Sequence, residues 1–433
     1  MDNPELIIIG AGLSGLSLGA LLAEEDKVKT LILEKDKNFG GRVKVWQKGG
    51  FLVDYGIHAL LLSDKSSLIS LFKKIGMKLE VKGAGLCLYE EGEFRNLIGE
   101  SITSLKDMGR LNLSDIIKLS RTFLDSQLFG REKYYSKSVE KWLKENQASE
   151  DLTKFFKGLC IGLLATTSLE RASLGEIIQF LRLVIRKRRA IGYPEGGWSS
   201  ILNPLVKKIK MSKKVKLCLG EKVEKIIIKR DEVRGVKSRS NEFESQAVIC
   251  AFPTQYLLRD NLLPEKIIPP DYRERLKKMR ETAGISLELG LKKRVSEEKR
   301  VIITLNPPSL GWLVSNVSER VAPPGKQLLT IFSPIFVEEF KDENLLKKSF
   351  QSLYNYYCQI FPKIEDNLEW KRELPLIVNG AELNTNQSLN RRPPIRPPEI
   401  KNLFLIGDTV AVAGAGGEMA VRSAIKCKQI LGG

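Results

Sequence analysis

The feature that most constrains this chain is a glycine-rich turn between an apolar run and a helix. Leu6–Ile9 is a run of four apolar residues, which is typical of a short buried strand. Gly10, Gly12 and Gly15 follow in G-x-G-x-x-G spacing. In such a turn the first glycine permits a tight bend, the second lets the backbone approach a pyrophosphate, and the third lets the helix pack closely. The stretch therefore predicts a dinucleotide site at the start of a parallel sheet.

An acidic residue stands where the ribose of such a dinucleotide would lie. A second apolar run begins at Thr30 and ends on Glu34. A carboxylate about 20 residues beyond the last glycine can accept hydrogen bonds from ribose hydroxyls. The motif alone occurs in ordinary turns, but strand, helix and acid together favour a binding site. The predicted contacts of this stretch are Gly10, Gly12, Leu13, Ser14, Gly15, Glu34 and Lys35.

A second glycine pair, Gly40-Gly41 followed by Arg42, indicates which dinucleotide binds. A nicotinamide domain has no need of glycines here, whereas FAD lies extended and passes close to this backbone. Arg42 offers charge to the phosphates, although a solvated surface arginine is the alternative interpretation. With this Gly-Gly-Arg turn after the fingerprint, the chain resembles the FAD-dependent amine oxidase and phytoene desaturase superfamily.

The resemblance implies an α/β fold with a Rossmann-like, doubly wound FAD-binding domain. A substrate domain, built from an antiparallel or mixed sheet and a helical cover, would interrupt it. The FAD-binding domain is expected to comprise residues 1–63, 191–255 and 376–433. The substrate domain is expected to comprise residues 64–190 and 256–375.

The C-terminal region carries a second signature of the same superfamily. The apolar run Leu403–Ile406 ends in Gly407-Asp408. The resemblance implies that Asp408 accepts a hydrogen bond from a ribityl hydroxyl. No cysteine lies between Gly407 and Gly417, which favours noncovalent FAD.

The resemblance places two further parts of the chain against FAD. Val223 matches the position whose backbone meets the adenine. A glycine-lined helix start is expected to aim its free N–H groups at the flavin, where negative charge gathers on reduction. The residues of this helix start are Gly416, Gly417, Glu418 and Met419.

A turn after Phe51 contains the only histidine of the chain, in the sequence Gly56-Ile57-His58. This G-x-H form resembles plant-type phytoene desaturases and hydroxysqualene dehydroxylases more than amine oxidases. All three residues are predicted to contact FAD, with His58 as the candidate catalytic group near the isoalloxazine. The alternative, a histidine that merely satisfies a buried turn, stays open.

Composition bounds the other classes of function. The six cysteines are scattered without a C-x-x-C pair, so a disulfide framework and a metal site are not expected. No signal peptide precedes the first strand and no apolar run reaches about 18 residues, so we expect a cytoplasmic protein. The net charge is +18, but aromatic residues are not interleaved with the basic clusters, which argues against nucleic-acid binding.

Peripheral contact with a membrane is left open by the segment Ile177–Arg189. It is a dense apolar run followed by four basic residues. Such a helix can lie on an anionic membrane. The favoured interpretation is a core helix whose basic end suits the helix dipole.

Together these features predict an FAD-dependent oxidoreductase that transfers hydride from substrate to flavin N5. The G-x-H turn, the apolar helical cover and the basic surface favour a hydrophobic isoprenoid or carotenoid-like substrate. The alternatives are an amine oxidase, a protoporphyrinogen oxidase, a redox-neutral carotenoid isomerase and, less favoured, a flavoprotein scaffold without activity. Gly83-Ala84-Gly85 lacks a third glycine and a following helix, so no second dinucleotide domain is expected.

Overall fold

A five-stranded parallel sheet forms one half of the molecule. In this computed structural model, which describes residues 3–56, 58–101, 111–397 and 400–432, the strand order is β10-β2-β1-β14-β20 and every pair is parallel. The apolar runs become fully buried strands because helices cover the sheet. The strands are β1 (Leu6–Ile9), β2 (Thr30–Glu34), β10 (Val215–Leu219), β14 (Ala247–Cys250) and β20 (Leu403–Leu405).

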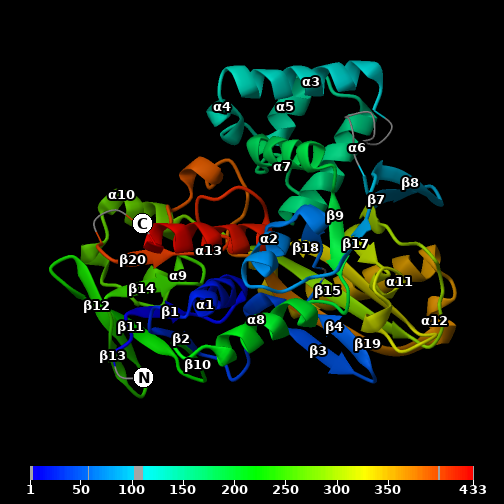
Figure 1. The fold of residues 1–433 in the computed structure, drawn as a ribbon. Helices are drawn as coiled ribbons and strands as arrows, with labels where there is room; N and C mark the ends of the chain where they lie inside the picture. The colour runs from blue at the N-terminus through cyan, green and yellow to red at the C-terminus, as the bar shows by residue number, and fades with distance from the viewer. Residues whose placement is uncertain (1–2, 57, 102–110, 398–399, 433) are drawn as a thin grey trace.

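Helices from both ends of the chain pack together on this sheet. Helix α1 packs against α8 and α13, so that the first and last helices of the chain lie side by side (Figure 1). The helices are α1 (Leu13–Glu25), α2 (Ser67–Lys74), α8 (Ser199–Met211) and α13 (Gly416–Gly432). A short antiparallel sheet packs against β14 through β12. It is formed by β11 (Val223–Lys229), β12 (Glu232–Ser238) and β13 (Glu242–Glu244). Two small helices follow, α9 (Tyr256–Arg259) and α10 (Pro270–Lys277).

A seven-stranded mixed sheet forms the other half, in the order β19-β15-β18-β17-β16-β7-β8. Its pairs are antiparallel except β16 with β7. Helix α11 (Glu343–Ile360) packs against β15, and the short α12 (Ile364–Asn367) follows it. The strands are β7 (Leu86–Glu90), β8 (Glu93–Ile98), β15 (Thr282–Leu291), β16 (Val301–Leu305), β17 (Pro308–Trp312), β18 (Gln327–Ile335) and β19 (Leu368–Asn379).

One expected strand of this sheet lies elsewhere. The sequence predicts a strand over 312–316, but β17 occupies Pro308–Trp312, and Val314–Asn316 forms a 3-10 turn. The reason is a tight hairpin in which Leu305 on β16 pairs with Pro308. Proline and glycine in this stretch are typical of a turn, so the pairing with β16 overrides the local signal.

Two small sheets link the halves. Strands β3 (Val45–Lys48) and β4 (Phe51–Asp54) form a hairpin. Strand β9 (Ile191–Pro194) lies between β5 (Leu60–Leu61) and β6 (Val81–Ala84). The expected α/β fold is confirmed, while the exact division into domains stays a prediction.

A layer of helices, here called the helical cap (residues 111–189), stands above both halves (Figure 1). Asn112, Ser138 and Ser149 start three of its helices, each accepting a hydrogen bond from a backbone N–H of the first turn. The cap contains α3 (Leu113–Leu128), α4 (Glu132–Tyr135), α5 (Val139–Glu145), α6 (Glu150–Leu159) and α7 (Leu174–Lys187).

The burial of helix α7 decides between a core helix and a membrane-surface helix at this apolar run. Ile177, Leu181 and Val184 are fully buried in the main core. The core interpretation is therefore confirmed, and an interfacial helix at Ile177–Arg189 is wrong because protein already covers its apolar face. Among the helices of the described residues, none is long and apolar enough to cross a membrane.

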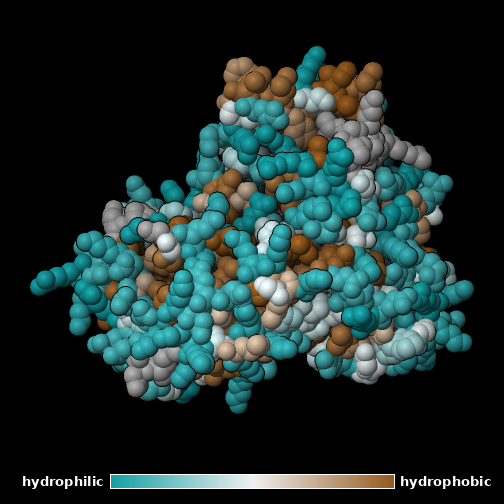
Figure 2. Space-filling model, in the orientation of Figure 1, coloured by the Kyte–Doolittle hydropathy of each residue, from teal (hydrophilic) through white to brown (hydrophobic). Residues whose placement is uncertain are grey.

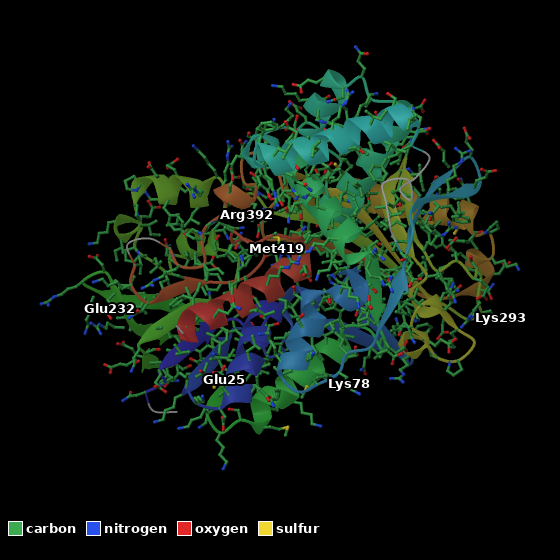
Figure 3. The ribbon with its side chains drawn as sticks, turned by 45° about the horizontal axis from the view of Figure 1, so that its top comes forward. Glu25, Lys78, Glu232, Lys293, Arg392 and Met419 are labelled. Atoms are coloured by element: carbon green, nitrogen blue, oxygen red, sulfur yellow. The ribbon has the colours of Figure 1, made fainter. Side chains whose placement is uncertain are left out.

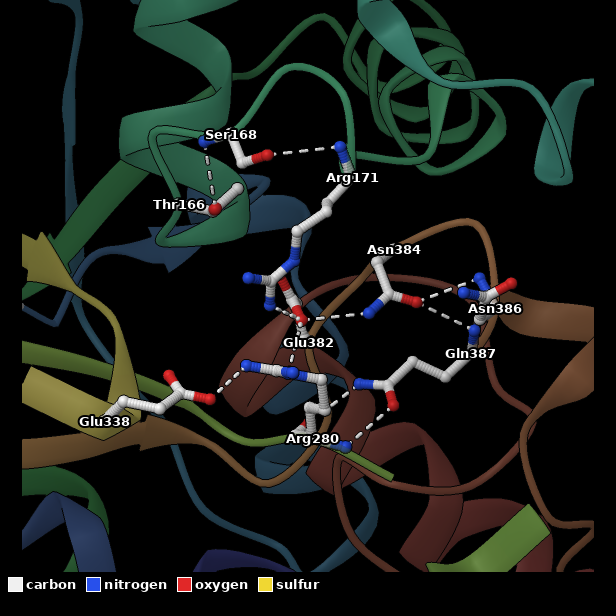
Figure 4. Close-up of polar contacts among 9 residues, drawn as sticks. All are labelled: Thr166, Ser168, Arg171, Arg280, Glu338, Glu382, Asn384, Asn386 and Gln387. Carbon is white, nitrogen blue, oxygen red and sulfur yellow. Dashed lines mark hydrogen bonds and ion pairs between the residues drawn. The ribbon is translucent and has the colours of Figure 1, made fainter. Parts of the chain in front are cut away.

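Two ion pairs, each with a buried carboxylate, fasten the cap to the C-terminal region. Arg392 binds Glu176 of α7 at 2.7 Å, with both side chains almost completely buried. Glu382 is bound by Arg171 and accepts from Asn384 Nδ2 at 2.9 Å (Figure 4). Arg392 is buried, and Figure 3 places it between the helices of the cap and α13.

Candidate cofactor site

The first glycine turn has the geometry that the motif predicts. Gly10 has a φ of +105°, which favours glycine. A Cβ on Gly15 would lie 2.0 Å from the carbonyl oxygen of Gly10, so only glycine lets α1 approach the loop. A Cβ on Gly12 would meet no described atom within 4 Å. The backbone at Gly12 therefore faces open space that a ligand can enter.

Helix α1 presents an uncapped N-terminus to that space. Its N-cap is Gly12, and no side chain of the described residues caps it. Leu13 and Ser14, in its first turn, are buried. The first N–H groups of a 13-residue helix, together with its dipole, favour an anion. The pyrophosphate of a dinucleotide fits this position.

The second glycine pair lies directly against the first turn. The N–H of Gly40 donates to the carbonyl of Ala11 at 2.9 Å. A Cβ on Gly41 would lie 3.2 Å from Gly12 Cα, and both Gly40 and Gly41 have positive φ. The two glycine-rich stretches therefore form one surface of exposed backbone.

Glu34 holds the glycine turn from the end of β2. Its buried carboxylate accepts from the N–H of Ala11 at 2.7 Å and from the N–H of Asp36 at 3.0 Å. The carboxylate thus stands beside the turn, where a ribose would lie, whereas Lys35 is exposed.

The chain before Val223 runs alongside Glu34. The N–H of Glu221 donates to the carbonyl of Glu34 at 2.8 Å, and Val223 itself is buried at the start of β11. Glu221 Oε1 is buried and has no hydrogen-bond partner among the described residues. Such an orphaned oxygen is rare in a complete structure, and a ligand hydroxyl or amino group would satisfy it.

Arg42 and Asp408 join the two signature stretches. Each terminal nitrogen of the Arg42 guanidinium donates to one carboxylate oxygen of Asp408 at 2.7 Å. Asp408 also accepts from the N–H of Gly380 at 2.8 Å. Burial would raise the pKa of Asp408, but Arg42 and the hydrogen bonds lower it overall. Arg42 is thus paired within the protein, and its contact with the phosphates stays a prediction.

The C-terminal signature meets the start of α1. Gly407 has a φ of +136°, and a Cβ there would lie 4.0 Å from Ser14 Oγ. A Cβ on Gly417 would lie 3.3 Å from Leu13 Cδ2 and 3.2 Å from the Trp198 ring. The N-terminal ends of α1 and α13 therefore lie together, as a shared cofactor requires.

The other residues at the start of α13 are packed into the protein. Gly416 has a positive φ, and Met419 is buried inside the molecule (Figure 3). The Glu418 carboxylate accepts from the Ser67 hydroxyl at 2.6 Å and from Arg422 at 2.8 Å. Its side chain therefore fastens α13 to α2, and a contact of Glu418 with the cofactor stays a prediction.

His58 lies beside this junction. Its ring is 5.5 Å from the ring of Trp198, whose Nε1 donates to the carbonyl of His58 at 3.0 Å. His58 Nε2 is buried without a partner among the described residues. Burial lowers the pKa of His58 to about 4, so the ring is neutral near pH 7. Gly56 has a φ of +91°, and Ile57 lies outside the described residues.

A buried acid precedes His58 on the same turn. Asp54 accepts from the hydroxyl of Tyr193 at 2.5 Å and from the N–H of Trp198 at 3.2 Å. Burial raises the pKa of Asp54 to about 7, although these hydrogen bonds oppose the rise. Asp54 is not among the site residues predicted from the sequence.

A second buried acid supports the turn from β15. Glu288 accepts from the N–H of Gly56 at 3.2 Å and binds Arg372, which donates to the carbonyl of Asp54 at 3.1 Å. Sequence reasoning missed this contact too. Its signal was present, because Glu288 is the one charged residue in the apolar strand β15.

The assembled residues fit FAD. The open backbone at Gly12 and the uncapped start of α1 suit a pyrophosphate. The Glu34 carboxylate suits a ribose. The buried atoms Glu221 Oε1 and His58 Nε2 have no hydrogen-bond partner among the described residues, and a ligand could supply one. FAD would be held by parts of the chain that begin near residue 10 and end near residue 417.

The chain is similar to known proteins in sequence and in fold. A model of the family described as flavin-containing amine oxidoreductase matches residues 13–427. The chain is 38% identical over 82 residues to an inactive all-trans-retinol 13,14-reductase from Danio rerio, a match covering 19% of this chain. It is 23% identical over 270 residues to a lycopene-forming phytoene desaturase from Pseudescherichia vulneris, covering 56% of this chain. It spans only 13% and 54% of the lengths of these two relatives.

A solved structure extends the likeness to the whole fold. An oxidoreductase from Methanosarcina mazei matches with a TM-score of 0.79 at 18% identity, covering 98% of this chain and 99% of the other. At that identity the match shows the fold, and the fold agrees with the one expected from the sequence. The family model covers nearly all of the chain. The chain therefore belongs to the flavin-containing amine oxidoreductase family, and its cofactor is FAD.

Proposed function

We propose that this oxidoreductase dehydrogenates a hydrophobic, isoprenoid-like substrate, with the flavin as hydride acceptor. The observation that carries the proposal is the half-buried His58 ring, which packs on Trp198 beside the starts of α1 and α13 and is neutral near pH 7. A neutral imidazole offers no negative charge to select an ammonium group, and both rings offer apolar surface to a hydrocarbon. The phytoene desaturase relative supports the same substrate class.

The buried carboxylates near His58 are already engaged. Asp54 is bound by Tyr193 and Trp198, and Glu288 is bound by Arg372. An ammonium substrate would therefore have to displace internal partners before it could pair with either carboxylate. This arrangement favours an uncharged substrate.

The protein's part in the reaction is to hold and orient. Bound FAD supplies the hydride acceptor. The Asp54 and Glu288 contacts fix the turn that carries His58. The start of α13 lies beside the start of α1, where its first N–H groups and its dipole would favour negative charge. His58 Nε2, which has no hydrogen-bond partner within the described part of the chain, is available for a hydrogen bond with a ligand.

The second candidate is oxidation of an amine, which the family's description favours. An anaerobic titration separates the two. FAD-loaded protein is mixed with phytoene in detergent micelles or with putrescine, and the flavin absorption band is followed. We expect bleaching by phytoene, with a product two hydrogens lighter, and none by putrescine.

The other outcomes are equally distinct. Bleaching by putrescine alone would overturn the proposal in favour of amine oxidation. Bleaching by protoporphyrinogen alone would favour that oxidase activity. A product of unchanged mass, formed only with reduced flavin, would indicate an isomerase. A flavin that no substrate bleaches would indicate a scaffold.

A further inference from the structure

The most exposed large apolar side chains of the cap gather on α3 and the residue after it. Figure 2 shows brown side chains along the top edge of the molecule, where Figure 1 places α3. The residues are Leu113, Ile117, Leu124, Leu128 and Phe129, which are 69%, 41%, 56%, 65% and 76% exposed.

Their spacing makes one continuous stripe. Leu113, Ile117, Leu124 and Leu128 recur at intervals of four, seven and four residues, which places them on one face of a helix. An ordinary surface helix turns its apolar face inward. Helix α3 instead buries Asp115 and Thr122, and Trp142 Nε1 donates to Thr122 at 3.1 Å. Asp115 and Thr122 thus serve the interior, while much of the apolar surface of α3 faces outward.

The charges of α3 are arranged to suit an anionic partner. Asp115 is buried and accepts from Ser149 and from Lys118 at 3.4 Å. Asp125 is held by Tyr134 and by Lys133 at 2.5 Å. The exposed positions of α3, which is described throughout, include Arg121 and no carboxylate.

The helical cap as a whole also carries a net positive charge. Residues 111–189 contain fifteen Lys or Arg and nine Asp or Glu. Two copies of the chain that met through this face would bring two basic caps together, which is unfavourable. A stable protein interface also needs about 800 Å² from each partner. One helix of 16 residues, about 24 Å long at the outer end of the cap, is a narrow ridge.

We propose that the outer face of α3 docks the protein on an anionic lipid bilayer. Leu113, Ile117, Leu124, Leu128 and Phe129 would enter the boundary between headgroups and acyl chains, and Arg121 would lie among the headgroups. The proposal concerns where the protein resides and does not depend on which substrate it oxidises.

Vesicle flotation tests the docking. FAD-loaded protein is floated with vesicles of phosphatidylcholine alone or with added phosphatidylglycerol. We expect the wild type to float with the anionic vesicles, and less so as salt is raised. Leu124→Gln combined with Leu128→Gln should lower the partition coefficient by about tenfold or more, because two apolar side chains are lost.

A matched variant controls for the loss of exposed apolar surface in general. Met211 on α8 and Ile430 on α13 are also exposed. Met211→Gln combined with Ile430→Gln should float like the wild type. Glutamine keeps helix propensity close to that of leucine, so both double variants should retain FAD and the wild-type melting temperature.

Three results would overturn the docking. The wild type could stay unbound with anionic vesicles, or the α3 double variant could float as well as the wild type. Sedimentation could instead show a wild-type dimer that the α3 variant dissociates, in which case a second copy of the chain covers the face.

Discussion

Two residues on one turn have pKa values that are shifted in opposite directions. Burial lowers the pKa of His58 to about 4, because the imidazolium loses its hydration. Burial raises the pKa of Asp54 to about 7, because the carboxylate loses its hydration. The turn beside the cofactor site is therefore held with an uncharged imidazole, and its acid changes charge near neutral pH.

His58 should weaken the fold in acid. The unfolded chain binds a proton on His58 near pH 6.5, whereas the folded state resists protonation down to about pH 4. Relative to His58→Gln, the wild type should lose about 2 kcal/mol of unfolding free energy between pH 8 and pH 5. Urea denaturation of both FAD-free proteins at the two pH values measures this. An unchanged difference would show that His58 is not held neutral.

Asp54 gives a control of opposite sign. Its folded pKa lies above its unfolded value, so its stabilising proton is present in acid and is lost as pH rises through about 7. Relative to Asp54→Asn, the wild type should gain about 2–3 kcal/mol between pH 8 and pH 5. The same sign for both variants would contradict the opposite shifts.

At the scale of elements, two glycines of the first turn have different roles: Gly15 is needed for packing, and Gly12 borders the space for a ligand. A Cβ on Gly12 meets open space, whereas one on Gly15 meets the carbonyl of Gly10 at 2.0 Å. The packing of α1 on β1 therefore constrains Gly15, whereas the constraint of Gly12 by a ligand stays a prediction. Both constraints were predicted from the motif alone.

Alanine substitutions at these two glycines should differ accordingly. Gly12→Ala should lower the stability of the FAD-free protein by no more than about 1 kcal/mol, the cost of alanine at a helix N-cap. It should weaken FAD binding about ten- to a hundredfold, because its methyl group occupies ligand space. Gly15→Ala should destabilise the FAD-free protein by about 1–3 kcal/mol. Thermal melting and FAD titration of both variants test this. A Gly12→Ala protein that binds FAD like the wild type would place the pyrophosphate elsewhere.

The elements that sequence predicted well are those fixed by local signals. Strands β1, β2 and β20 are apolar runs, and the glycines between or after them have few conformational alternatives. The residues that surround each element come from distant parts of the sequence, so local patterns do not predict them. The same kind of pattern produced the covered helix α7 and the uncovered helix α3, because burial depends on which neighbours the fold supplies. The lone charge in β15 marks Glu288 as unusual, but its partner Gly56 lies 232 positions away, and no local pattern identifies that partner.

At the scale of the whole molecule, distant segments hold each other in place. Arg42 pairs with Asp408 across 366 positions, and α1 packs on α13. Arg392 pairs with Glu176, which joins the C-terminal region to the cap. The cofactor site and the cap above it therefore depend on both ends of the chain.

Removing Arg392 should expose this dependence. Arg392→Met leaves Glu176 as an unpaired buried acid, so the unfolding free energy should fall by about 3–5 kcal/mol. Adding Glu176→Gln should restore part of the loss, since the buried charge is then gone. Chemical denaturation of the single and double variants tests this. A loss below about 1 kcal/mol for the single variant would mean that the pair does not fasten the cap.

The central claim is that both ends of the chain enclose one noncovalently bound FAD. The most direct test is acid precipitation of the purified protein. Chromatography of the supernatant identifies the released flavin and measures its amount, which is compared with the amount of protein precipitated. We predict one FAD released per chain, with a colourless pellet. Flavin that stays with the pellet, FMN in place of FAD, or a protein that neither contains nor takes up FAD would contradict the claim.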